Sequence, residues 1–198
     1  MAAQTYPLLP IGRALVPGTK MVLPVTDFLP REGDRVLVVL RGGGPTEEPA
    51  PGRVGTVALV EGVRPLDSRI ALVTLSGLHL AAVASLDKVG EVFQVTASGV
   101  EGPAEVADCR ELIGRAQSML RRQMAIRAEA GEVADISLQL SADPVSASHQ
   151  VASQLRVTWP EIQEVLEAGD AAERLRRALT VMERETGLLV RLLSREGA

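Results

Sequence analysis

The amino-acid sequence predicts an α+β fold, with a β-rich first half and a helical second half. Residues 6–97 hold short runs rich in Val, Leu and Ile, separated about every eight to twelve residues by Gly, Pro or Asp. Beyond residue 105 the apolar residues recur instead every three or four positions, the period of an amphipathic helix. This change of period predicts two domains, 1–100 and 101–198.

The first half is expected to form a barrel or a sandwich, because many short strands joined by tight turns are typical of both. Pro10 and Pro24 fall inside the first two strand patterns. Proline cannot donate a backbone hydrogen bond, so we expect both at sheet edges or bulges. The segment GGGPTEEPAPG, 42–52, is expected to be a surface loop. The candidate strands are 6–12, 20–25, 35–41, 53–64, 69–76, 78–84 and 89–97.

The second half predicts one long helix and three further helices whose starts are marked by capping residues. An apolar stripe predicts the first helix over about 103–129. Asp143 before Pro144, Thr158 three residues before Glu161, and Asp170 carry N-capping chemistry. The last helix has a heptad-like seam that could pack within the bundle or against a second copy, so weak self-association stays open. Its residues are Leu175, Leu179, Met182, Leu189 and Leu193.

Composition disfavours nucleic acid and membrane as partners. The net charge is −4, no basic patch is evident, and there are only four aromatic residues for base stacking. The opening apolar stretch, 8–25, contains charges and helix-breaking prolines and is no convincing membrane span. Cys109 is the only cysteine, so no internal disulfide can form. With no secretory signal pattern, we expect a cytoplasmic protein.

No pattern in the sequence indicates catalysis, a cofactor or a metal. Gly42 to Gly44 lacks the phosphate-loop pattern, and Glu47 and Glu48 would repel a phosphate. His79 is expected to face solvent between two core-facing leucines, and His149 lies in a polar helical stretch. Neither has a partner motif for nucleophilic catalysis. We therefore expect no catalytic, cofactor-binding or metal-binding residue.

Three apolar residues are candidates for contacts with a protein partner. Phe28 and Leu29 precede Pro30 and a charged run. An apolar pair in such a loop is less readily assigned to a buried core. Trp159 opens a predicted helix, where it could pack against a neighbour or project as a binding anchor. For Trp159 packing is the favoured interpretation, whereas for Phe28 and Leu29 the two readings are balanced.

Three blocks of the chain resemble the Lon N-terminal substrate-binding domain family. The stretch YPLLPIGRALVPGTKMVLPV, 6–25, is similar to the family's first hairpin, with Pro17-Gly18 at its turn. The stretch RVGTVALVEGVRPLDSRIALVTLSGLHLAAV, 53–83, resembles its central strands. The stretch LRVTWPEIQEVLEAGDAAERLRRALTVMERE, 155–185, resembles a short helix that leads into a long one.

The resemblance implies a six-stranded, PUA-like β pseudo-barrel followed by a helical bundle. It also implies a non-enzymatic module that holds unfolded or degron-bearing proteins or other protein partners. The family's ATPase and Ser-Lys peptidase lie in later domains, which this chain lacks, so we expect either a free-standing protein or a fragment. The family usually has a helix after the second strand, where this chain has only 26–34. A PUA-like nucleic-acid-binding protein is the alternative.

Overall fold

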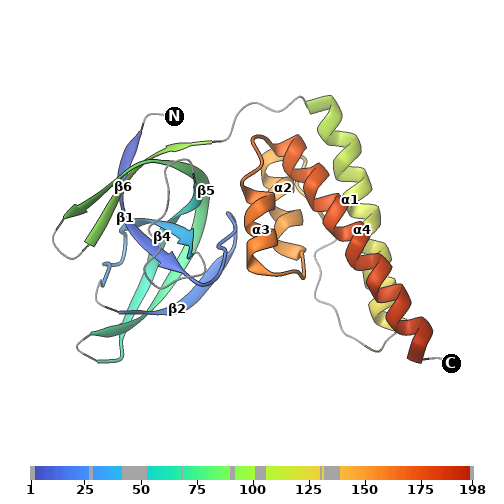
Figure 1. Ribbon diagram of the computed structural model, residues 1–198, viewed down its shortest axis with the longest axis horizontal. Coiled ribbons are helices and arrows are strands. Elements are labelled where there is room, and N and C mark those ends of the chain that lie inside the picture. The colour runs from blue at the N-terminus through green and yellow to red at the C-terminus, as the bar shows by residue number, and fades with distance from the viewer. Residues whose placement is uncertain are drawn as a thin grey trace. The chain divides into compact units, whose positions relative to one another are not determined.

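The computed structural model describes residues 3–26, 29–41, 53–67, 69–89, 92–100, 106–129, 131 and 139–196 (Figure 1). Contacts divide the chain into two compact units. The first contains Met1–Glu101 and Trp159–Glu167, and the second contains Gly102–Thr158 and Ala168–Ala198. A division at residue 100, as the sequence suggests, differs from these units mainly in the place of one short helix.

The first unit contains one six-stranded sheet that closes on itself. Its strand order is β2-β5-β4-β3-β1-β6, and a further pairing of β5 with β6 completes a pseudo-barrel. The predicted β-rich half, its barrel form and its place before the helices are confirmed. The strands are β1 (Gln4–Ile11), β2 (Lys20–Thr26), β3 (Arg35–Leu40), β4 (Val54–Pro65), β5 (Ile70–Val89) and β6 (Val92–Gly99).

The first two strands do not form the hairpin that the sequence resemblance suggested. β1 pairs in parallel with β3 through Leu8–Ile11 and antiparallel with β6 through residues 4–7. β2 pairs antiparallel with β5. Pro10 and Pro24 each remove one backbone donor, which weakens any ladder between these two strands. The turn at Val16–Thr19 therefore connects two separate parts of the barrel.

β5 is one long strand, where the sequence pattern suggested two that end and begin around Gly77. A Cβ atom at Gly77 would lie 2.7 Å from the carbonyl oxygen of Val16, so glycine lets this strand pass close to the turn after β1. Val57 pairs with His79 and Ala58 with Gly77, which leaves Leu78 as an extra residue. Leu78 is therefore exposed, not in the core as predicted, whereas Leu80 is fully buried.

Two clusters of apolar side chains form the core of the barrel. One packs β1, β2, β3, β4 and β5 together, with Met21, Leu23 and Val63 partly buried against it. The other lies among β1, β3, β4, β5 and β6, with Leu86 and Phe93 at its margin. Residues of β1 enter both clusters, because Leu9 and Ile11 belong to the first and Leu8 to the second. Consecutive residues of β1 therefore pack into different clusters, one on each face of the strand.

The helices begin where the capping residues predicted. They are α1 (Val106–Glu129), α2 (Pro144–Gln154), α3 (Trp159–Leu166) and α4 (Ala171–Glu196). The Asp143 carboxylate accepts a hydrogen bond from the Ser146 amide at 2.8 Å, and the Asp170 carboxylate accepts one from the Glu173 amide at 2.8 Å. In the second unit α4 packs along α1 and α2 (Figure 1). None of the described helices is long and apolar enough to cross a membrane.

The short helix α3 belongs with the barrel, not with the other helices. Its Gln163 side chain is buried and donates a 2.7 Å hydrogen bond to the carbonyl oxygen of Val54, at the start of β4. Arg53 and Glu167 form an ion pair at 3.8 Å beside this bond. A buried carbonyl needs a donor, so Gln163 fastens α3 to the strand.

Polar groups are buried within the helical unit. Arg174 is fully buried, and its guanidinium donates to the Ser148 hydroxyl at 2.9 Å and lies 3.3 Å from His149 Nε2. The Gln123 side chain donates to the carbonyl oxygen of Met182 at 3.2 Å. Glu185, which the sequence suggested was solvated, is only 9% exposed. Sequence periodicity missed Arg174 and Glu185 because it identifies a buried face mainly by its apolar members.

Candidate functional site

Two adjoining cavities lie along the first two strands of the barrel. Their volumes are about 490 and 240 Å³, and six residues line both. We call this combined depression the β1–β2 groove. The shared residues are Pro10, Ile11, Leu23, Pro24, Thr26 and Arg41.

The groove runs between two strand edges that are not hydrogen-bonded to each other. In the described residues, β2 pairs with β5 alone, and the Leu8–Ile11 half of β1 pairs with β3 alone. The carbonyl oxygen of Ile11 faces β3, because it accepts a 2.7 Å hydrogen bond from the Arg41 amide. Backbone groups of successive strand residues point to opposite sides. The backbone of Pro10 therefore faces away from β3, toward the open edge. The prediction that Pro10 and Pro24 lie at strand edges is confirmed.

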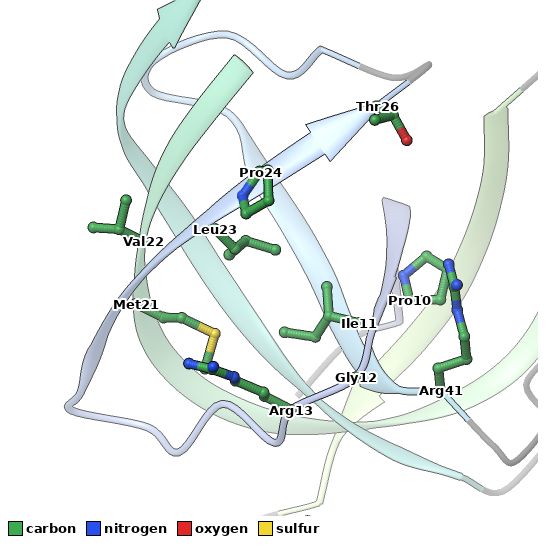
Figure 2. Close-up of a pocket in the computed structure, with 10 residues that line it drawn as sticks. All are labelled: Pro10, Ile11, Gly12, Arg13, Met21, Val22, Leu23, Pro24, Thr26 and Arg41. Carbon is green, nitrogen blue, oxygen red and sulfur yellow. The ribbon is translucent and has the colours of Figure 1, made fainter. Parts of the chain in front are cut away.

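The floor of the groove is apolar. Side chains of β2 alternate between exposed and partly buried, and Met21 and Leu23 point inward against the barrel core. Ile11 reaches the same region from the end of β1 and is 8% exposed. Figure 2 shows Ile11 between the side chains of Arg13 and Arg41, with Met21 and Leu23 on the neighbouring strand. An apolar side chain placed here would be removed from water.

Two exposed guanidinium groups lie at the groove. Arg13 lies two residues after the end of β1, and Arg41 directly follows β3, where its amide donates to the Ile11 carbonyl oxygen. Both side chains line the larger cavity. Among the lining residues that the structure describes, no Asp or Glu is present in either cavity. The described lining therefore combines an apolar floor with two positive charges.

The turn after β1 holds the two edges in place. Gly18 has a φ of +81°, which suits the third position of a turn with Pro17 before it. The Thr19 amide donates to the Val16 carbonyl oxygen at 3.1 Å, and the Gly18 amide donates to the Gly77 carbonyl oxygen at 2.8 Å. These bonds fasten the connection onto β5, so the edges cannot slide together without breaking them.

The three residues that the sequence suggested for partner contacts do not line the groove in the structure or lie outside the described residues. Leu29 lies between β2 and β3 and is 40% exposed, and Trp159 begins α3 and is 39% exposed. Neither lines either cavity of the groove. Phe28 lies outside the described residues. Sequence reasoning missed the groove itself, for which the prolines inside two strand patterns were the available signal.

The described residues offer no constellation for catalysis or metal binding. Within that part of the chain, no group of three or more His, Cys, Asp and Glu side chains could hold a metal ion. His79 is a half-buried residue of β5, and His149 is buried in the helical unit. Cys109 is fully buried in α1. We take the β1–β2 groove as the candidate site, because its lining combines apolar side chains with two guanidinium groups.

Comparison with known proteins identifies the family. The model of the ATP-dependent protease La (LON) substrate-binding domain matches residues 5–184. The chain is 26% identical over 174 residues to a Lon protease of Azospirillum brasilense, covering 86% of this chain and 21% of that protein. It is 28% identical over 201 residues to the Lon protease of Escherichia coli K12, covering 92% and 25%. The chain thus spans about a quarter of these relatives' length.

Solved structures agree in fold. The N-terminal domain of the Mycobacterium avium complex Lon protease is similar with a TM-score of 0.67 and 20% identity, over 91% of this chain and 98% of that one. A Lon N-terminal domain protein from Xanthomonas campestris gives a TM-score of 0.63 and 18% identity, over 89% and 98%. The family match, the six-stranded barrel and the helices after it lead to one conclusion: this chain belongs to the Lon substrate-binding domain family.

Proposed function

We propose that this chain is a non-enzymatic protein-binding module that holds unfolded or degron-bearing proteins. The observation that carries the proposal is the β1–β2 groove, where an apolar floor lies between two unpaired strand edges. An unfolded segment exposes both apolar side chains and free backbone groups. Extended peptides bind proteins by laying alternate side chains into such depressions beside a strand. Membership of a substrate-binding family supports the same role.

The test is association with an unfolded client. Labelled casein would be titrated with the purified chain, with native, disulfide-bonded lactalbumin as a folded control, and binding followed by fluorescence anisotropy. We expect saturable binding of casein in the micromolar range and none of the folded control, because only the unfolded chain presents extended apolar segments. Absence of casein binding at several hundred micromolar would overturn the proposal. Retention of labelled RNA without casein binding would favour the nucleic-acid alternative.

A further inference from the structure

The charge of the β1–β2 groove narrows the class of peptide that fits it. Resting on the proposed function, we propose that the groove takes an extended segment with apolar residues in its centre and carboxylates at its flanks. The central side chains would cover Ile11, Met21 and Leu23. The flanking carboxylates would pair with the guanidinium groups of Arg13 and Arg41.

The shape and length of the groove suit an extended peptide. Its longer wall follows β2 from Met21 to Thr26. A strand rises about 3.3 Å per residue, so a peptide that follows this wall would be roughly six residues long. An extended peptide turns alternate side chains to one face, and two or three of them would meet the floor. A compact or helical ligand would not follow the strand edge in this way.

The backbone of the two strand edges limits how a peptide can pair with them. Pro10 and Pro24 withhold an amide donor from each edge, so a regular ladder with an incoming strand is interrupted on both sides. This protects the edges against pairing indiscriminately with any strand. It also means that backbone hydrogen bonds cannot supply all of the orientation or specificity. Side-chain contacts must therefore contribute more than they do when a strand simply joins a sheet.

The two arginines of the groove complement the charge of an acidic peptide. The described lining has two arginines and no carboxylate, while the chain as a whole carries a net charge of −4. The described lining of the groove is thus positive on a protein that is acidic as a whole. Guanidinium groups bind carboxylates through paired, charge-assisted hydrogen bonds, which also fix the direction of the ligand. A peptide with a lysine at either flank would be repelled.

The experiment uses the whole chain and synthetic peptides labelled with fluorescein. The first peptide is Asp-Ser-Leu-Ser-Ile-Ser-Asp, in which Asp, Leu, Ile and Asp share one face of the extended chain, and the second replaces both Asp residues by Asn. We expect the acidic peptide to bind about tenfold more tightly than the neutral one, since each of two exposed ion pairs is worth a few-fold. Raising the salt concentration should reduce this ratio. A third peptide with its Leu and Ile residues replaced by Ser should not bind measurably.

Variants of the chain assign the effect to the groove. The double variant Arg13→Gln/Arg41→Gln should bind the two peptides equally, at the affinity of the neutral one. The matched control Arg110→Gln/Arg121→Gln removes the same charge from exposed positions of α1, in the other unit. It should keep the tenfold preference. Circular dichroism would establish that all variants are folded.

The outcomes separate this inference from the proposed function. Casein binding without any preference for the acidic peptide would overturn the inference and leave the protein-binding role standing. Equal loss of preference in both double variants would show a general charge effect and also overturn it. Displacement of the peptide by polyuridylate would assign the two guanidinium groups to phosphate instead. Failure of both casein and peptides to bind would overturn both proposals.

Discussion

At the scale of single residues, burial and the neighbouring Arg174 together keep the His149 ring neutral. Burial disfavours the imidazolium form, and the positive charge of Arg174 disfavours it further, while Asp143 acts in the opposite direction. Together they lower the pKa of His149 to about 4. A guanidinium can only donate, so His149 Nε2 accepts and the ring proton lies on Nδ1. The neutral ring is part of the packed helical unit.

This shift predicts that acid weakens the fold. His149 has a lower pKa in the folded state than its usual 6.5, so the unfolded chain binds a proton first as the pH falls. Stability is therefore lost progressively between about pH 6.5 and pH 4. From pH 7 to pH 5 the loss through His149 should be about 2 kcal/mol in the free energy of unfolding.

Urea denaturation at the two pH values would measure that loss. The variant His149→Gln should lose about 2 kcal/mol less than the natural chain between pH 7 and pH 5. His79→Gln, which makes the same substitution at the other histidine of the chain, is the matched control. An identical pH dependence in His149→Gln and in the natural chain would contradict the prediction.

A second prediction at this scale concerns Gly77. An alanine there would place its Cβ 2.7 Å from the Val16 carbonyl oxygen and 3.1 Å from Pro17 Cα. Both are backbone atoms of a turn held by hydrogen bonds, so they cannot move aside cheaply. We expect Gly77→Ala to reduce the free energy of unfolding by roughly 1–3 kcal/mol.

Gly62 of β4 provides the matched control for this substitution, because its Cβ would meet nothing within 4 Å. Gly62→Ala should change the stability by no more than about 0.5 kcal/mol. Chemical denaturation of the two variants side by side would test the comparison. Equal effects would show that the close approach of β5 to the turn is unimportant.

The sequence predicted single elements well wherever the signal was local. Asp143 and Asp170 marked helix starts because an N-cap involves only three or four consecutive residues. The candidate strand 20–25 likewise corresponds to β2, Lys20–Thr26. Strand pairing was not predictable in this way. The expected hairpin of β1 and β2 was wrong because partners separated by many residues, β3, β5 and β6, compete for those edges.

The groove illustrates the same limit. Its prolines were readable as edge markers, but Arg13 and Arg41 are 28 positions apart (41 − 13) and nothing in their local sequence joins them. Only the parallel pairing of β1 with β3 brings the ends of those strands together. By contrast, Leu29 and Trp159 stood out because large apolar residues next to turns are visible in a sequence. Their role in binding stays a prediction.

At the scale of elements, α3 depends on a buried hydrogen bond to the barrel. Gln163→Leu would leave the Val54 carbonyl oxygen without this donor in an apolar setting, and should cost roughly 1–3 kcal/mol. Amide exchange in α3 should become faster. The variant Arg53→Gln removes the half-exposed ion pair with Glu167 and should cost less than about 1 kcal/mol. The reverse order would contradict the importance of the buried bond.

For the whole molecule, the chain passes from the first unit to the second, returns for α3, and leaves again. The two units are therefore not consecutive segments. We predict that a fragment of residues 1–101 is less stable than the barrel in the full chain, because it lacks α3 and the Gln163 donor. Urea denaturation followed by the signal of the β-structure would measure the difference. A fragment with the midpoint of the full chain would contradict the prediction.

The return of α3 to the barrel also has a consequence for synthesis on the ribosome. Domains generally fold in order as they emerge, the first ones early. Here the barrel strands end at Gly99, yet the unit is complete only with Glu167. The nascent barrel must therefore wait, with the Val54 carbonyl unpaired by Gln163, while most of the helical unit is translated. During that interval the edges of β1 and β2, which contain Pro10 and Pro24, offer fewer backbone N–H donors to a neighbouring chain.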